Sequence, residues 1–71
     1  MKVRLKMFAI LKQRSGVGEA ELELATGATV ARAMEEIARR FGTIADLLPR
    51  AAVAVNLAYS PRTTVLCEGD E

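Results

Sequence analysis

Two stretches in which apolar and charged residues alternate precede the one stretch of this chain that has helical spacing. Every second side chain is apolar over residues 2–9, and residues 19–25 repeat the pattern with glutamates between the apolar positions. A period of two predicts strands with one buried face. The outer face of the first strand is basic and that of the second is acidic, which favours a hairpin with opposite charges paired across it. Residues 10–14 and the glycine-containing loop after them predict a helical turn within this connection.

The apolar spacing changes to three and four between residues 30 and 41, and this predicts one main helix. Its stripe consists of Val30, Ala33, Met34, Ile37, Ala38 and Phe41. Thr29 is placed to cap the amino end, because a threonine oxygen can accept from the first free backbone N–H groups. Gly42 follows the last apolar residue, where a glycine can end the helix with a positive φ.

The last third of the chain predicts two more strands. Residues 51–55 are apolar on both faces, which fits a strand covered by the helix on one side and by small side chains on the other. Residues 63–66 are a short β-type run, and Glu68-Gly69-Asp70 has turn composition. The predicted order β-β-α-β-β indicates an α+β fold in a single domain spanning residues 1–71.

Composition excludes several classes of function. The chain has 71 residues, one cysteine, no histidine and a net charge of +1. A disulfide within the chain, a structural zinc site and histidine catalysis are therefore ruled out, and we expect no metal and no cofactor. The charge balance predicts neither nucleic acid nor membrane as a partner. With no signal peptide or apolar run of membrane-spanning length, we expect a cytoplasmic protein.

Few residues are candidates for a site, and none has the setting of a catalytic residue. The alternating Glu19, Glu21 and Glu23 fit a solvated strand face better than a cation site. Cys67 fits packing better than sulfur chemistry, since it has no histidine or basic neighbour in sequence to activate the thiol. Phe8 lies on the predicted outer face of the first strand, so it is either a partner-binding anchor or folded over the sheet edge. Tyr59 would share a patch with it if the first and fourth strands lie close together.

Four segments together resemble a known family. Residues 3–9 (VRLKMFA), a helix starting at Thr29-Val30, residues 53–56 (VAVN) and residues 68–71 (EGDE) follow in the order and spacing seen in the small subunits of molybdopterin synthase. These MoaD-like proteins are ubiquitin-like sulfur carriers. The thiamine-pathway carrier ThiS shares the V-N and G-D features, but the Phe-Ala stretch and the Leu-Lys-Gln-Arg turn after it favour the molybdopterin carrier.

The resemblance implies a β-grasp fold, a mixed sheet packed on one main helix, and a role in molybdenum cofactor biosynthesis. Such a carrier donates sulfur from a C-terminal thiocarboxylate and is a cosubstrate rather than a catalyst. An E1-like adenylating enzyme activates the carboxylate, and the tail then enters the large subunit of molybdopterin synthase. By position, Phe8 and Tyr59 match hydrophobic surface positions that the family uses to bind partners.

The chain departs from the family after residue 71. The family continues with a final strand, central in the sheet beside the first strand, and then a Gly-Gly tail. Without that strand we expect the first strand to have an unpaired edge and Glu71 to lie on a turn, and we assign no catalytic residue. Two other functions stay open: a ThiS-type carrier for thiamine biosynthesis, and a non-catalytic ubiquitin-like interaction domain.

Overall fold

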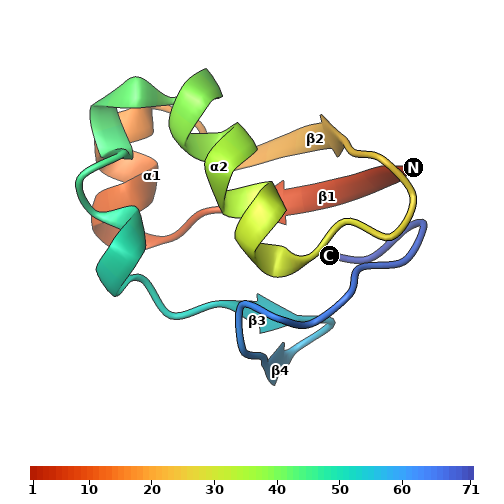
Figure 1. Ribbon diagram of the computed structural model, residues 1–71. Coiled ribbons are helices and arrows are strands. Elements are labelled where there is room, and N and C mark those ends of the chain that lie inside the picture. The colour runs from red at the N-terminus through yellow and green to blue at the C-terminus, as the bar shows by residue number, and fades with distance from the viewer.

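The computed structural model describes all of residues 1–71 and contains two hairpins and one main helix. The elements, in chain order, are β1 (Lys2–Lys6), α1 (Ala9–Ser15), β2 (Glu19–Glu23), α2 (Val30–Arg40), β3 (Ala54–Val55) and β4 (Ala58–Tyr59). Two 3-10 helices, Gly42–Ile44 and Leu48–Arg50, connect α2 to β3. Helix α2 packs on the β1–β2 hairpin, and the carboxyl terminus lies between β1 and the β3–β4 hairpin (Figure 1).

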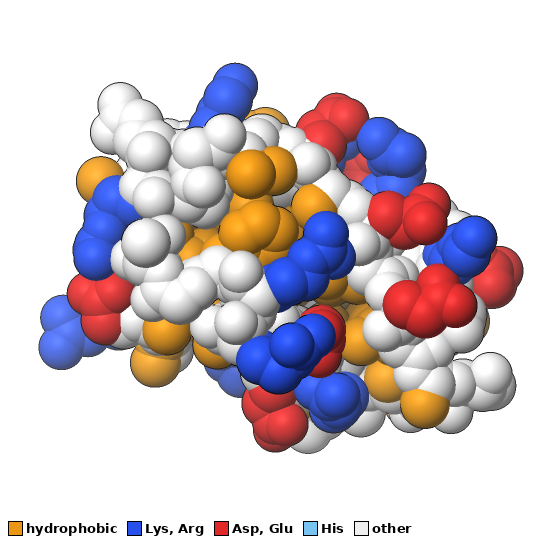
Figure 2. Space-filling view, turned by 90° about the horizontal axis from the view of Figure 1, so that it is seen from above, with side chains coloured by type: hydrophobic (Ala, Val, Ile, Leu, Met, Phe, Trp, Pro, Cys, Tyr) orange, Lys and Arg blue, Asp and Glu red, His pale blue; other side chains and the backbone are white.

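The predicted hairpin between the first two strands is confirmed. β1 and β2 are antiparallel, and each basic residue of β1 lies opposite a glutamate of β2, as in Arg4 opposite Glu21. The closest ion pair is diagonal, however, since Arg4 lies 2.9 Å from Glu19. These side chains are exposed, so each pair contributes at most about 1 kcal/mol. Figure 2 shows charges of both signs interspersed over the face that it presents.

The first strand is shorter than its alternation predicts. It ends at Lys6 instead of residue 9, and the chain turns at Phe8 into α1. The predicted helical turn is confirmed, but it begins one residue earlier, at Ala9, and continues to Ser15. Ala9 has a φ of +49°, an unusual value for a residue with a β-carbon. This sharp turn explains why the alternation of residues 2–9 does not correspond to one continuous strand.

The core forms between α2 and the β1–β2 hairpin, as the apolar stripe predicts. The oxygen of Thr29 caps α2 by accepting from the N–H of Arg32 at 3.3 Å. The eleven buried residues are Val3, Met7, Leu22, Leu24, Ala28, Val30, Ala33, Ile37, Ile44, Leu48 and Leu66. Ile44 is fully buried, so the connector after α2 closes one end of this core.

Gly42 does not have the positive φ that the sequence predicts for it. Gly42 follows α2 directly, but it has no positive φ and instead starts the first 3-10 helix. The chain does not reverse at this point, because the tighter helix continues from the carboxyl end of α2 and carries Ile44 into the core. The left-handed glycine that ends a helix is Gly16, after α1, with a φ of +75°.

The last two predicted strands are only partly present. Within residues 51–55, only Ala54 and Val55 pair, with β4. Residues 63–66 form a single bridge, between Val65 and Thr29. A strand requires a partner for its backbone groups, and no strand lies beside residues 51–53. The structure therefore has two separate two-stranded ladders, with an open space between β1 and residues 51–55.

Candidate functional site

The space between β1 and residues 51–55 is an apolar groove with a volume of about 500 Å³. Its floor includes the buried side chains of Leu22, Val30 and Ile37, so the hydrophobic core forms the bottom of the groove. β1 forms one wall, and residues 51–55 form the other. Nineteen of its 23 lining residues are hydrophobic, and a surface of this composition is suited to an extended apolar segment.

Phe8 and Tyr59 both line this groove. Phe8 is 70% exposed and Tyr59 is 86% exposed. The exposure of Phe8 has a different cause from the predicted one, because Phe8 is the residue before α1 and not a member of β1. The shared patch was predicted on the condition that the first and fourth predicted strands lie close together. The fourth, residues 63–66, forms only a bridge to Thr29, and the two side chains share the groove without it.

Leu57 also lines the groove, and sequence reasoning missed it. It is 96% exposed and has a φ of +72° in the two-residue turn between β3 and β4. Turns of this kind favour glycine at that position, so a leucine here costs conformational energy and buries no surface. The signal in the sequence was an apolar residue directly after the turn-forming Asn56.

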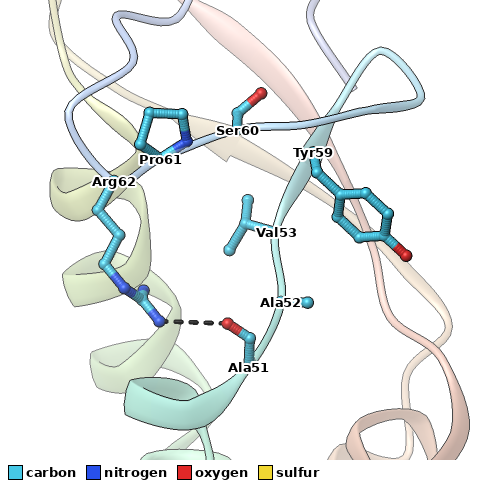
Figure 3. A pocket seen from close by; sticks show the side chains of 7 residues that line it. All are labelled: Ala51, Ala52, Val53, Tyr59, Ser60, Pro61 and Arg62. Carbon is cyan, nitrogen blue, oxygen red and sulfur yellow. Dashed lines mark hydrogen bonds between the residues drawn. The ribbon is translucent and has the colours of Figure 1, made fainter.

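A second, shallower hollow of about 420 Å³ lies beside the same segment. There, Arg62 donates to the carbonyl oxygens of Leu48, Pro49 and Ala51 at distances of 2.9 to 3.3 Å. Figure 3 shows Arg62 on the Val53 side, with the Tyr59 ring pointing away from both. Arg62 therefore holds residues 48–51, at the start of this wall, in place without a strand partner, and Tyr59 stays free of this contact.

The C-terminal segment lies at one end of the groove. Gly69 donates to the carbonyl of Lys2, and Arg4 donates to the carbonyl of Asp70, both at 2.8 Å. Residues 69–70 thus run parallel to β1 and pair with the first part of its outer edge. The predicted unpaired edge is therefore limited to the rest of β1. Glu71 lies past the turn at the mouth of the groove, with its carboxylate 3.3 Å from Lys6, so its predicted place on the turn is wrong.

The remaining candidate residues form no site. Glu19, Glu21 and Glu23 lie exposed along β2, and no group of three or more His, Cys, Asp or Glu side chains is placed to hold a metal. Cys67 is an exposed free thiol. No helix of the structure has the length and apolar character needed to cross a membrane.

Comparison with known proteins decides the family. The ThiS family model matches residues 5–71. The chain belongs to the ThiS family. A solved structure described as "Putative molybdopterin converting factor, subunit 1" from Pyrococcus furiosus is 33% identical, with a TM-score of 0.80. The match covers 97% of this chain and 88% of that one. No curated protein matches the chain.

A second solved structure confirms the fold of this ThiS-family chain. SAMP1 from Haloferax volcanii superposes with a TM-score of 0.89 at 17% identity, covering 99% of this chain and 88% of that one. The predicted ubiquitin-like β-grasp and the resemblance to MoaD- and ThiS-like carriers are thus confirmed. In both solved chains, 12% of the length lies outside the match.

Proposed function

We propose that this domain, residues 1–71, is the sulfur-carrier subunit of a molybdopterin synthase and acts in the cytoplasm. A carboxylate at the C-terminal end of the polypeptide would attack the α-phosphorus of ATP, releasing pyrophosphate and forming an acyl-adenylate. A sulfide equivalent then displaces AMP and leaves a thiocarboxylate. The carrier gives up this sulfur to a pterin precursor on the large subunit, so it is a cosubstrate and holds no catalytic residue of its own.

The sequence match to the Pyrococcus furiosus protein is the observation that carries this proposal. That protein's description names a molybdopterin converting factor, and 33% identity over nearly the whole chain goes beyond shared fold. The path of the C-terminal segment adds support. It runs parallel to β1 and reaches an open apolar groove at Glu71, which is where the family's final strand would lie beside β1.

Two partners follow from the proposal: an E1-like adenylating enzyme and the large subunit of molybdopterin synthase. We assign Phe8 and Tyr59 as anchors for these partners. Both are large, mostly exposed and directed to one groove, and aromatic side chains dominate many protein interfaces. Neither side chain is part of the buried core.

Thiamine-type sulfur delivery is the second candidate, because the family model that matches the chain is that of ThiS. The two carriers differ in the acceptor of the sulfur. A reconstitution therefore distinguishes them: the thiocarboxylated protein is mixed with the large synthase subunit and the pterin precursor, and in parallel with a thiazole synthase. Molybdopterin formation supports the proposal. Sulfur transfer only in the thiazole reaction would replace it with the second candidate, and binding without transfer in either would indicate an interaction domain.

A further inference from the structure

The outer edge of β2 has no neighbouring strand. β2 pairs only with β1, and residues 69–70 bond to the other edge of β1, so the open edge of β2 lies on the opposite side of β1 from the C-terminal segment (Figure 1). None of the glutamates of β2 lines the apolar groove. This edge is therefore a surface of its own, separate from the groove.

The pairing with β1 determines which backbone groups of β2 face outward. Opposite residues of an antiparallel pair alternate between two that exchange hydrogen bonds and two that do not. Arg4, which lies opposite Glu21, donates its N–H to Asp70 instead, so this pair is of the second kind. The N–H and C=O groups of Glu21 consequently point away from β1, and by the same alternation so do those of Glu19 and Glu23.

Arg40 covers one of these outward groups. Its guanidinium, in the last turn of α2, donates to the carbonyl oxygen of Glu21 at 2.6 Å. The N–H of Glu21 and the backbone groups of Glu19 and Glu23 make no hydrogen bond within the chain. A row of free donors and acceptors on the edge of a strand is what an extended segment needs to join the sheet as a further strand.

The backbone geometry makes a second copy of this chain a poor occupant. In any antiparallel register, the residues whose backbone groups face the new strand lie opposite residues of the same kind in that strand. Two copies joined through β2 would therefore place glutamates directly opposite glutamates. Like charges in that position destabilise a sheet.

A basic segment fits the same edge. Glu21 and Glu23 are exposed and form no ion pair, whereas Glu19 already contacts Arg4. A strand with lysine or arginine at every second position would place opposite charges beside Glu21 and Glu23. β1 has this pattern on the other side of β2, where Lys2 lies opposite Glu23. Such cross-strand pairs of opposite charge stabilise a sheet.

We propose that the outer edge of β2 is a docking surface for an extended segment of a partner protein that has basic residues at alternate positions and adds to the sheet as a strand. This inference goes beyond the proposed function and does not depend on it. Arg40 occupies the central acceptor, the carbonyl of Glu21, until an N–H of the segment replaces it. The glutamates favour a basic strand and disfavour a second copy, so the edge is selective.

The test uses the full polypeptide of the gene and a short capped peptide in which lysine and valine alternate. In NMR-detected hydrogen exchange, we expect the amide of Glu21 to exchange about tenfold more slowly with saturating peptide, because its free N–H gains an acceptor. Exchange at Leu22, whose N–H faces β1, should not change. The same peptide with N-methylated lysine backbone nitrogens lacks the donors that face β2, so it should bind at least about tenfold more weakly.

Three variants separate the edge from general charge attraction. Glu21→Gln combined with Glu23→Gln should weaken binding of the peptide about tenfold, because its lysines lose the opposite charges. Glu35→Gln, at an exposed glutamate of α2, is the matched control and should leave the affinity unchanged. Arg40→Met keeps an apolar stem and removes the guanidinium. Binding should then tighten about threefold, since the peptide no longer displaces a donor from Glu21.

Five results would overturn the docking surface. They are unchanged exchange at Glu21, equal binding of the N-methylated peptide, equal effects of the Glu35 substitution and the paired substitutions in β2, no gain in affinity in Arg40→Met, and slower exchange at Glu21 when the protein alone is concentrated. The last result would identify a second copy as the occupant of the edge.

Discussion

Phe8 and Tyr59 lie on the same groove although they come from opposite ends of the chain, one before α1 and the other in β4. No strand pairing brings them together, since β1 and β4 belong to different ladders. Their common position follows from the C-terminal segment, which hydrogen-bonds to β1 through residues 69–70 and to Asn56 through Glu71. Two aromatic side chains that are mostly exposed on one apolar groove form a surface suited to a protein partner.

Removing the Phe8 ring should weaken partner binding without unfolding the domain. We expect Phe8→Ala to reduce affinity for the large synthase subunit by about thirtyfold, or about 2 kcal/mol, because an interface anchor loses its buried contact. The melting temperature should change little, since Phe8 is 70% exposed. Titration calorimetry and thermal denaturation measure the two effects. Val65→Ala is the matched control, being an exposed apolar residue outside the groove; equal losses in both variants would contradict the role of Phe8.

Replacing Leu57 by glycine should stabilise the domain. Leu57 has a φ of +72° and is 96% exposed, so glycine relieves the strained conformation and loses no buried surface. We expect a gain of about 0.5–1 kcal/mol in the free energy of unfolding, measured by urea denaturation. Leu57→Ala keeps the unfavourable φ and should show no gain. A loss of stability in Leu57→Gly would mean that the leucine makes contacts that compensate its strain.

The contribution of the Thr29 cap to the stability of the domain should be measurable with a single substitution. In Thr29→Ala the N–H of Arg32 loses the threonine oxygen that accepts from it. We expect the free energy of unfolding to fall by about 1 kcal/mol. Thr26→Ala, at an exposed threonine that makes no side-chain hydrogen bond, should leave it unchanged. Equal effects of the two substitutions would show that the Thr29 oxygen does not cap the helix.

Asp70 should contribute to the loss of stability in acid. Its pKa is lowered in the folded protein by the bonds from Asn56 and Cys67. The unfolded chain therefore binds the proton more readily, so the stabilisation is complete above the ordinary carboxyl pKa of about 3.9 and is lost as the pH falls through the folded value. Denaturation followed from pH 7 to well below the ordinary carboxyl pKa of about 3.9 should show a shallower acid loss in Asp70→Ala. Glu36, whose pKa is lowered by Arg39, retains its own contribution in both proteins. An Asp70 carboxyl titrating at or above its ordinary value in NMR would contradict this prediction.

The elements that could be predicted are those with a strong local pattern. The β1–β2 hairpin and α2 follow from periods of two and about 3.6, and the Thr29 cap from its place before the apolar stripe. Residues 51–55 have strand composition, but most of them do not pair, because a strand also depends on a neighbour that its own sequence does not specify. The positive φ of Ala9 likewise results from how the chain enters α1.

Less of the candidate site than of the fold could be predicted from the sequence. Phe8 and Tyr59 could be named from exposure and resemblance, whereas the turn conformation that displays Leu57 could not be read from composition. The bonds of Asn56 to Asp70 and Glu71 join residues 14 and 15 positions apart. Such contacts form only when the two turns meet in the folded chain, so no local sequence pattern predicts them.

The most direct test of sulfur transport is the intact mass of the polypeptide made from its own gene, before and after incubation with an E1-like adenylating enzyme, ATP and a sulfide source. A sulfur carrier gains the mass difference between one sulfur and one oxygen atom, and a second incubation without ATP shows no gain. We predict this gain on the C-terminal fragment after proteolysis. An unchanged mass with an active enzyme, or sulfur found on Cys67 instead, would contradict the account.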